Sequence, residues 1–453
     1  MAIGVIFAIS LSLTPSFAAI KAGSSCTKVG KISTSGGFEF KCVKKNRKLI
    51  WQRTGKLKTA TSTPSATPTS TPAPSITPTP SATSSPSSTP TPPARSVLNC
   101  KIPVSDGRGD VAIGFPRISD RLKSIGNVVI QVVFVDFPDA PATMTTREAF
   151  AKVSEAANLF GELSYGRLQF AMQPNHKWYR MSKTAKSYAP LNQSFLHHRA
   201  YIVEATNLAD GDVDFSKTDG VLILANPDAR DLGNSGPAFA SIFGNGITLD
   251  GKYIANGATS AYDLNYWGYI WLNHEFGHAM GLVDLYAFRP EDSTNPNDYH
   301  RFVGEYSLMG LSSLTTNSPG FLAWERWLLG WIDDDQILCL QEKTTTTLVT
   351  PVQRKSGLKA IVIPLSLTRV VVVESRRAEG VDKNLTKPGA LVYVVDSAVQ
   401  SGLGPVKVIP IESSDNRRLK STRAQGESVT VDGVTITVKK SDADGDLIEV
   451  SRS

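Results

Sequence analysis

The sequence predicts a mixed α+β (α/β-like) domain over residues 98–342 and, after it, an all-β, sandwich-like domain over residues 343–453. In the first region, apolar runs rich in β-branched residues alternate with stretches of helical periodicity, which is typical of a sheet covered by helices. In the second region, short β-branched runs follow one another between clusters of Gly, Pro, Asp and Ser, as they do in an antiparallel sandwich. A small module and a low-complexity segment precede both domains.

The first residues have the composition of an export signal. Residues 1–19 form a short apolar stretch that contains Pro15 and ends in small residues around Ala18 and Ala19. Such a stretch is too short for a permanent membrane anchor. The basic residue that usually precedes a signal sequence is missing. We expect a signal peptide that is removed, and a secreted, extracellular protein.

Residues 20–57 predict a small, basic, β-rich module, because they alternate short apolar runs with glycine. So short a chain needs a disulfide, since it cannot bury a sufficient core. Between Lys21 and Lys58, eleven basic residues accompany one acidic residue, Glu39. The module is expected either to bind an anionic cell-wall or membrane surface, which would keep the protein at the cell surface, or only to be kept soluble by its lysines. Nothing resembles a nucleic-acid-binding module, so no nucleic-acid partner is expected.

Residues 58–97 consist almost entirely of Thr, Ser, Pro and Ala. With proline at every few positions and no apolar surface to bury, this segment predicts an extended, disordered linker. Its hydroxyl groups are candidate sites for O-linked sugar.

Four cysteines behind an export signal predict disulfides. Cys26 and Cys42 both lie in the small module and are the natural pair. Cys100 and Cys339 are then left to link the two ends of the α+β domain. The alternative is that the Cys100 sulfur binds the metal ion and so blocks the protein's own active site.

Four elements are expected within the α+β domain. They are strands over residues 127–137 and 220–226, a helix over 146–161 that begins at Thr145 or Thr146, and a helix over 263–280. In the all-β domain, the expected strands lie in the runs TTTTLVTPV, KAIVIPL, RVVVVES, ALVYVVD, VTVDGVTITVKK and DLIEVS.

The last helix of the α+β domain carries the motif H-E-x-x-H, at His274, Glu275 and His278. Residues four apart lie above one another on a helix, so both imidazoles face one point, which suits Zn²⁺. Glu275 is placed to deprotonate a metal-bound water. Gly281 allows a sharp helix end, after which Asp284 can supply the third ligand. The alternative is a helix whose histidines make ordinary hydrogen bonds.

The segment HEFGHAMGLVDLY resembles the H-E-x-x-H-x-x-G-x-x-D pattern of metzincin-like peptidases, specifically the immune inhibitor A (M6-like) family. Further segments are similar to this family, so that the resemblance covers residues 127–396. They are VDFPD from Val135, SYGRL from Ser164, SLMG from Ser307, VESRR from Val373 and GALVY from Gly389.

The resemblance implies a metzincin-type catalytic domain that holds one catalytic Zn²⁺. It implies a Met-turn at Met309, a methionine beneath the metal, for which ordinary core packing is the alternative. It also makes Glu305 a rival to Asp284 as the third ligand. Tyr306 stands where family members often have Trp, and is expected to pack or to stabilise the reaction intermediate.

The expected function is a zinc-dependent endopeptidase that hydrolyses protein or peptide substrates, with a zinc-activated water and Glu275 as the general base. One alternative is an inactive cell-surface binding protein that retains the fold. Another is a wall-attached structural protein that functions mainly through its N-terminal module.

The remaining candidate ligands have simpler explanations. His176, His197, His198 and His300 are expected to be surface or hydrogen-bonded residues. A structural Ca²⁺ site is an alternative at Asp442, Asp444 and Asp446, although Asp-Gly between two strands first indicates a hairpin turn.

Overall fold

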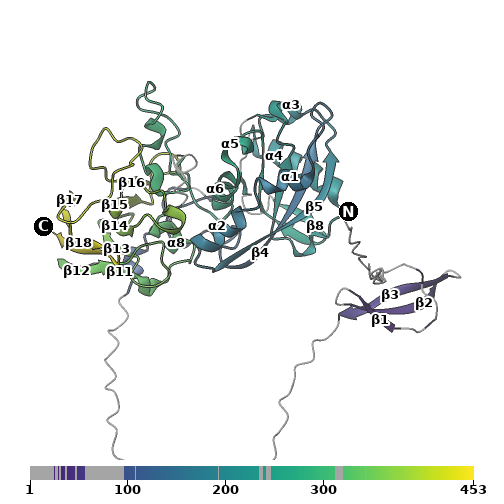
Figure 1. Cartoon of the computed structure of the whole chain (residues 1–453), viewed down its shortest axis with the longest axis horizontal. Helices are drawn as coiled ribbons and strands as arrows, with labels where there is room; N and C mark the ends of the chain where they lie inside the picture. Colours follow the sequence, from purple (N-terminus) through teal and green to yellow (C-terminus); the bar gives the residue numbers. More distant parts are fainter. Residues whose placement is uncertain are drawn as a thin grey trace, which may run out of the picture. The chain divides into compact units, whose positions relative to one another are not determined.

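The computed structural model describes residues 96–452, apart from 108, 192, 234–237, 241–245, 312–319 and 342. Nearer the N-terminus it describes Ser25, Val29 and the strand residues between 32 and 56. The chain divides into two compact units, Met1–Thr89 and Pro90–Ser453 (Figure 1). The predicted signal peptide, and the predicted linker up to residue 95, lie outside the described residues.

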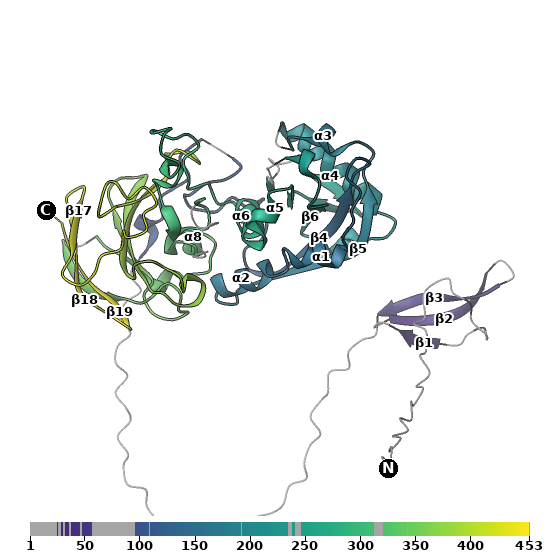
Figure 2. The same ribbon diagram turned by 45° about the horizontal axis from the view of Figure 1, so that its top comes forward.

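The N-terminal unit contains a three-stranded antiparallel sheet in the order β1-β2-β3 (Figure 2). Its strands are β1 (Ile32–Ser35), β2 (Phe38–Lys45) and β3 (Lys48–Lys56). Cys42 pairs with Trp51 across β2 and β3, and both side chains are buried. Cys42 is disulfide-bonded, but Cys26 lies outside the described residues, so that pairing stays a prediction.

The larger unit begins with a five-stranded sheet in the order β5-β4-β6-β10-β7, parallel except for β7. The strands are β4 (Gly126–Asp136), β5 (Leu168–Arg180), β6 (Gly220–Ala225), β7 (Ala238–Ala240) and β10 (Asn256–Thr259). A short two-stranded sheet of β8 (Ile247–Leu249) and β9 (Lys252–Ile254) stands apart from it. The two apolar strands expected from the sequence are β4 and β6, within one residue at each end.

Helices lie on both faces of this sheet, which is why β4 and β6 are apolar along almost their whole length. Val132 and Phe134 of β4 belong to a core cluster with α2 (Ala156–Leu163) and α6 (Tyr269–Ala279). Val133 and Val135, whose side chains point to the opposite face, pack in a second cluster with α4 (Phe195–Ala209). The short helix α3 (Ala185–Tyr188) lies beside α4.

Both helices expected in this region are interrupted. The first consists of α1 (Thr146–Ala151) and α2, with turns over residues 152–155. Thr145 forms the expected N-cap, in a capping box with Glu148. The second consists of α5 (Leu264–Trp267) and α6, because Gly268 between them has a positive φ of 57° that a continuous helix cannot contain.

From Ile337 onward the structure forms two packed sheets. The first has the order β11-β13-β14-β15-β16 and the second β12-β19-β18-β17. Their strands are β11 (Ile337–Cys339), β12 (Thr344–Val349), β13 (Ala360–Pro364), β14 (Arg369–Arg376), β15 (Gly389–Asp396), β16 (Val406–Val408), β17 (Ser428–Val431), β18 (Val434–Asp442) and β19 (Gly445–Arg452). Apolar residues of both sheets, such as Val371 and Ile448, form one cluster between them, as in a sandwich.

The opposite face of the first C-terminal sheet packs on the α+β region. One core cluster contains Phe276 of α6 and Trp324 of α8 (Ala323–Leu328) together with Val372 and Tyr393. In Figures 1 and 2, α6 lies between the sheet that contains β4 and the C-terminal strands. Helix and strand are thus mixed over several sheets, as predicted, while the boundary near residue 342 stays a prediction.

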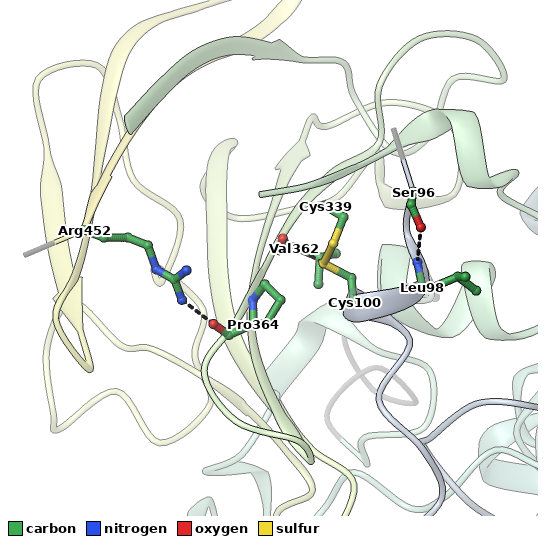
Figure 3. Close-up of a disulfide and its surroundings, with 7 residues drawn as sticks. All are labelled: Ser96, Leu98, Cys100, Cys339, Val362, Pro364 and Arg452. Carbon is green, nitrogen blue, oxygen red and sulfur yellow. Dashed lines mark hydrogen bonds between the residues drawn. A yellow bond between two sulfur atoms is a disulfide. The ribbon is translucent and has the colours of Figure 1, made fainter. Parts of the chain in front are cut away.

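The disulfide between Cys100 and Cys339 is confirmed (Figure 3). It joins the turn η1 (Leu98–Cys100) to β11, and the Cys100 sulfur lies 3.3 Å from the carbonyl oxygen of Val362. Cys100 is therefore not a metal ligand in this structure. Among the described residues, no helix has the length and apolar character to cross a bilayer.

Candidate metal centre

The helix α6 presents the two histidines and then ends sharply. His274 and His278 lie one turn apart on it, and both rings face the same side. Gly281 has a φ of 102°, and the amides of Gly281 and Leu282 donate back to the carbonyls of His278 and Gly277. These bonds are those of a glycine-terminated helix. The expected turn at Gly281 is therefore present, and it brings the chain back beneath the helix.

Asp284 lies against both imidazoles after this turn. Its Oδ1 atom is 3.3 Å from His274 Nε2 and 3.0 Å from His278 Nε2, and the two Nε2 atoms are 3.2 Å apart. Within the described part of the chain, this is the one group of three His, Cys, Asp or Glu side chains that could share a metal ion. The three side chains proposed from the sequence therefore converge on one point.

In each imidazole, the hydrogen bond made by Nδ1 fixes the tautomer. His274 Nδ1 lies 3.0 Å from the carbonyl oxygen of Leu308, and His278 Nδ1 lies 2.8 Å from that of Leu282. A carbonyl oxygen only accepts hydrogen bonds, so each Nδ1 carries the proton. Each neutral ring then directs the lone pair of Nε2 into the group, which is the usual arrangement of metal-binding histidines.

These three side chains fit a divalent cation. With both protons on Nδ1, two nitrogen lone pairs and one buried carboxylate oxygen face one another within 3.3 Å. Burying a carboxylate oxygen in this way is costly unless a positive charge is near. Two histidines and one carboxylate, with a fourth position open, are a ligand set typical of catalytic zinc.

The side chains of this group shift each other's pKa. Burial lowers the pKa of His278, but the attraction of Asp284 outweighs it, so the pKa is raised overall. Burial acts to raise the pKa of Asp284, yet the two imidazoles lower it well below its ordinary value. Without a metal ion, a proton on His278 would supply the positive charge that the carboxylate requires.

Two further side chains border this group. Glu275 follows His274 on α6 and is half-buried. The Tyr286 ring centroid is 6.4 Å from that of His274. Burial, the negative charges of Asp284 and Glu275 and a hydrogen bond to Asp284 raise the pKa of Tyr286, so its hydroxyl stays protonated. Tyr286 was not singled out from the sequence, although its place two residues after Asp284 is a signal that could have found it.

Met309 lies directly under the helix that carries the histidines. A Cβ atom added at Gly277 would be 2.6 Å from the Met309 sulfur. Met309 is fully buried, and its carbonyl oxygen accepts the amide of Leu285 at 2.9 Å. The methionine therefore fills the space below the helix between the two histidines. This position agrees both with a Met-turn and with ordinary core packing.

Gly277→Ala is expected to lower the free energy of unfolding by about 1–3 kcal/mol, because the new methyl group overlaps the fully buried Met309 side chain. The matched control is Gly161→Ala in α2, where an added Cβ meets nothing within 4 Å. Since alanine favours helix more than glycine does, the control is expected to be stabilising by up to about 1 kcal/mol. Urea unfolding measures both, and equal effects of the two changes would contradict this contact.

A buried polar network holds the segment around Met309. The amide of Met309 donates to Ser307 Oγ at 3.0 Å, and Ser307 Oγ donates to Glu325 at 2.8 Å. Arg376 of β14 donates to the carbonyl oxygen of Tyr306 at 2.8 Å and pairs with Glu374. The segment that supplies the Leu308 carbonyl to His274 is thus fixed from the C-terminal sheet.

Glu305 and Tyr306 are not part of the metal-binding group. Glu305 is buried. Its nearest hydrogen-bond partner is Thr386 Oγ1 at 3.5 Å, and burial raises its pKa to about 7. Tyr306 is fully buried, and its hydroxyl accepts the amide of Ser421 at 3.2 Å. Asp284, and not Glu305, therefore belongs to the group of side chains that could share an ion.

The remaining histidines are not part of the group. His176 lies 3.2 Å from Thr146 Oγ1, His197 lies 2.7 Å from the carbonyl oxygen of Tyr188, and His198 lies 2.7 Å from Thr259 Oγ1. His300 is half-buried, and burial with the charge of Arg417 lowers its pKa to about 4.

The predicted calcium alternative lies at a hairpin. Asp442 ends β18 and is linked to β19 by a turn in which the amide of Asp444 donates to its Oδ1 atom at 2.9 Å. Asp446 is fully buried and accepts from Arg377 at 2.9 Å and 3.0 Å. The arginine thus takes the place that a cation would have beside Asp446.

Comparison with protein-family models gave no match, and comparison with curated proteins found no similar sequence. The resemblance to the immune inhibitor A family therefore stays a prediction that depends on the motifs quoted above.

Proposed function

We propose that this chain is a secreted zinc-dependent endopeptidase with a metzincin-type catalytic domain. The observation that carries the proposal is the group of His274, His278 and Asp284, in which three metal-binding atoms lie within 3.3 Å of one another. Glu275 beside this group supplies the base that water-mediated hydrolysis requires. The expected export signal and the confirmed disulfide both fit an oxidising, extracellular location.

Three protein ligands leave the fourth position of a tetrahedral zinc for water or substrate. A zinc ion held by His274, His278 and Asp284 would act as a Lewis acid and lower the pKa of a bound water to about 7. Glu275 accepts the proton of the attacking water and then transfers it to the leaving amine. The protonated hydroxyl of Tyr286 hydrogen-bonds to Asp284, so it helps to hold the third ligand.

Peptide bonds are the proposed substrate because of the resemblance in the motif and around Met309. The N-terminal sheet adds an attachment role in this proposal. Basic side chains are exposed along β2 and β3, namely Lys41, Lys44, Lys45, Lys48 and Arg53, and an anionic surface would attract them.

The test is to measure zinc content and casein cleavage on the same purified protein. We expect about one zinc per chain, loss of cleavage when a chelator removes the metal, and recovery when zinc is returned. Stoichiometric zinc without cleavage of casein or of a peptide library would instead support the inactive binding protein.

A further inference from the structure

A loop of the C-terminal sheet reaches the third metal ligand. It joins β15 to β16 and contains Ser401 and Gly402. The Asp284 amide donates to Ser401 Oγ at 2.9 Å, and the Gly402 amide donates to the Asp284 carbonyl oxygen at 3.1 Å. A segment 117 residues away in sequence therefore forms hydrogen bonds with both the amide and the carbonyl oxygen of Asp284.

The same loop also fixes the chain after Asp284. The amide of Phe288 donates to the Gly402 carbonyl oxygen at 3.0 Å. Gly402 has a φ of 72°, and an added Cβ would lie 2.3 Å from the Phe288 ring. Gln400 anchors the loop by donating to the Asp106 carbonyl oxygen at 3.1 Å. The loop is thus held against the metal-binding segment by bonds to separate parts of the chain.

The hydroxyl of Ser401 has a defined use in this arrangement. A serine hydroxyl has two lone pairs and one proton. Because one lone pair accepts the amide of Asp284, the proton remains free to bind an acceptor, and Asp284 Oδ2 lies 3.4 Å away. Ser401 is buried, with 5% of its surface exposed, so little water competes for this proton. Its bond to Oδ2 leaves Oδ1 facing the two imidazoles.

We propose that Ser401 is a positioning residue of the metal centre, which orients the Asp284 carboxylate so that Oδ1 binds the ion. This inference rests on the proposed function, because it assumes that the group binds zinc. It makes the C-terminal β-rich region part of the metal centre. Residues that hold a metal ligand by hydrogen bonds typically contribute about 10- to 100-fold to metal affinity.

The experiment measures the zinc dissociation constant of the full chain by competition with a chromogenic chelator. Ser401→Ala is expected to weaken zinc binding by about 10- to 100-fold. Ser401→Thr, which keeps the hydroxyl, is expected to bind zinc more tightly than the alanine variant. The matched control is Ser397→Ala at the start of the same loop. This buried serine donates to the carbonyl oxygen of Thr368 at 3.3 Å, and its change is expected to leave zinc binding unaltered.

A second readout follows the geometry of the ion. In protein loaded with Co²⁺, Ser401→Ala is expected to change the visible absorption spectrum, whereas Ser397→Ala is not. Thermal unfolding in excess chelator shows whether each variant folds without metal. Unchanged zinc affinity in Ser401→Ala would overturn the inference, as would equal losses in both alanine variants or a threonine variant as weak as the alanine one.

These outcomes are separate from a failure of the peptidase proposal. If the unaltered chain binds one zinc but cleaves no peptide, the proposed activity is wrong, while the role of Ser401 is still decided by the zinc constants. If Ser401→Ala binds zinc as tightly and cleaves casein as fast as the unaltered chain, only the role of Ser401 is wrong.

Discussion

Glu275→Gln is expected to lower kcat/KM for peptide hydrolysis by about 10²- to 10⁴-fold, the range that a positioned general base contributes. Glutamine has nearly the shape of glutamate but cannot accept a proton from the attacking water. Glu275 is not one of the three side chains whose atoms converge, so the zinc content is expected to stay at that of the unaltered protein. Initial rates on a fluorogenic peptide and metal analysis of the same sample measure the two quantities.

Glu412→Gln is the matched control, since Glu412 is exposed in the C-terminal region, and it is expected to leave both quantities unchanged. Full turnover by the Glu275 variant would end the proposed mechanism. Loss of zinc together with activity would show that Glu275 is needed for metal binding, which the proposed assignment of roles does not allow.

Asp284→Ala is expected to remove zinc, with a loss of affinity greater than the roughly 100-fold upper value for a residue that only supports a ligand. The remaining imidazoles would supply two ligands, whereas catalytic zinc sites have three from the protein. Activity is expected to fall with the bound zinc. Adding high zinc concentrations should restore part of it, because the base Glu275 is still present.

Glu305→Gln separates the two candidates for the third ligand. Glu305 is buried away from the metal-binding group, so this variant is expected to bind zinc with unchanged affinity. Equilibrium dialysis against zinc compares the two variants directly. Tight zinc binding by Asp284→Ala combined with its loss in Glu305→Gln would reverse the assignment.

Much of the candidate site follows from local rules that the sequence displays. Residues four apart lie on one side of a helix, so the spacing of His274 and His278 predicts that their imidazoles meet. Gly281 predicts where this helix ends. Asp284 follows so closely that no long loop intervenes, and the structure places its Oδ1 within 3.3 Å of both imidazoles. The pairing of Cys100 with Cys339 followed from the count of cysteines and the isolation of the small module.

What could not be predicted depends on contacts between residues far apart in sequence. No local pattern relates Ser401 to Asp284, or Arg376 to the carbonyl oxygen of Tyr306. The breaks in the two expected helices were missed for a different reason. The helix expected over residues 263–280 includes Gly268, and glycine permits the positive φ that the structure has there.

Cys100 and Cys339, which are 239 positions apart in sequence, close one covalent ring of the chain. Both histidines, the carboxylate that joins them and Met309 all belong to this ring. A single proteolytic nick anywhere along it would leave two pieces connected through the sulfur bridge, so neither piece could diffuse away. Cleavage at one site would therefore leave His274, His278 and Asp284 in one molecule.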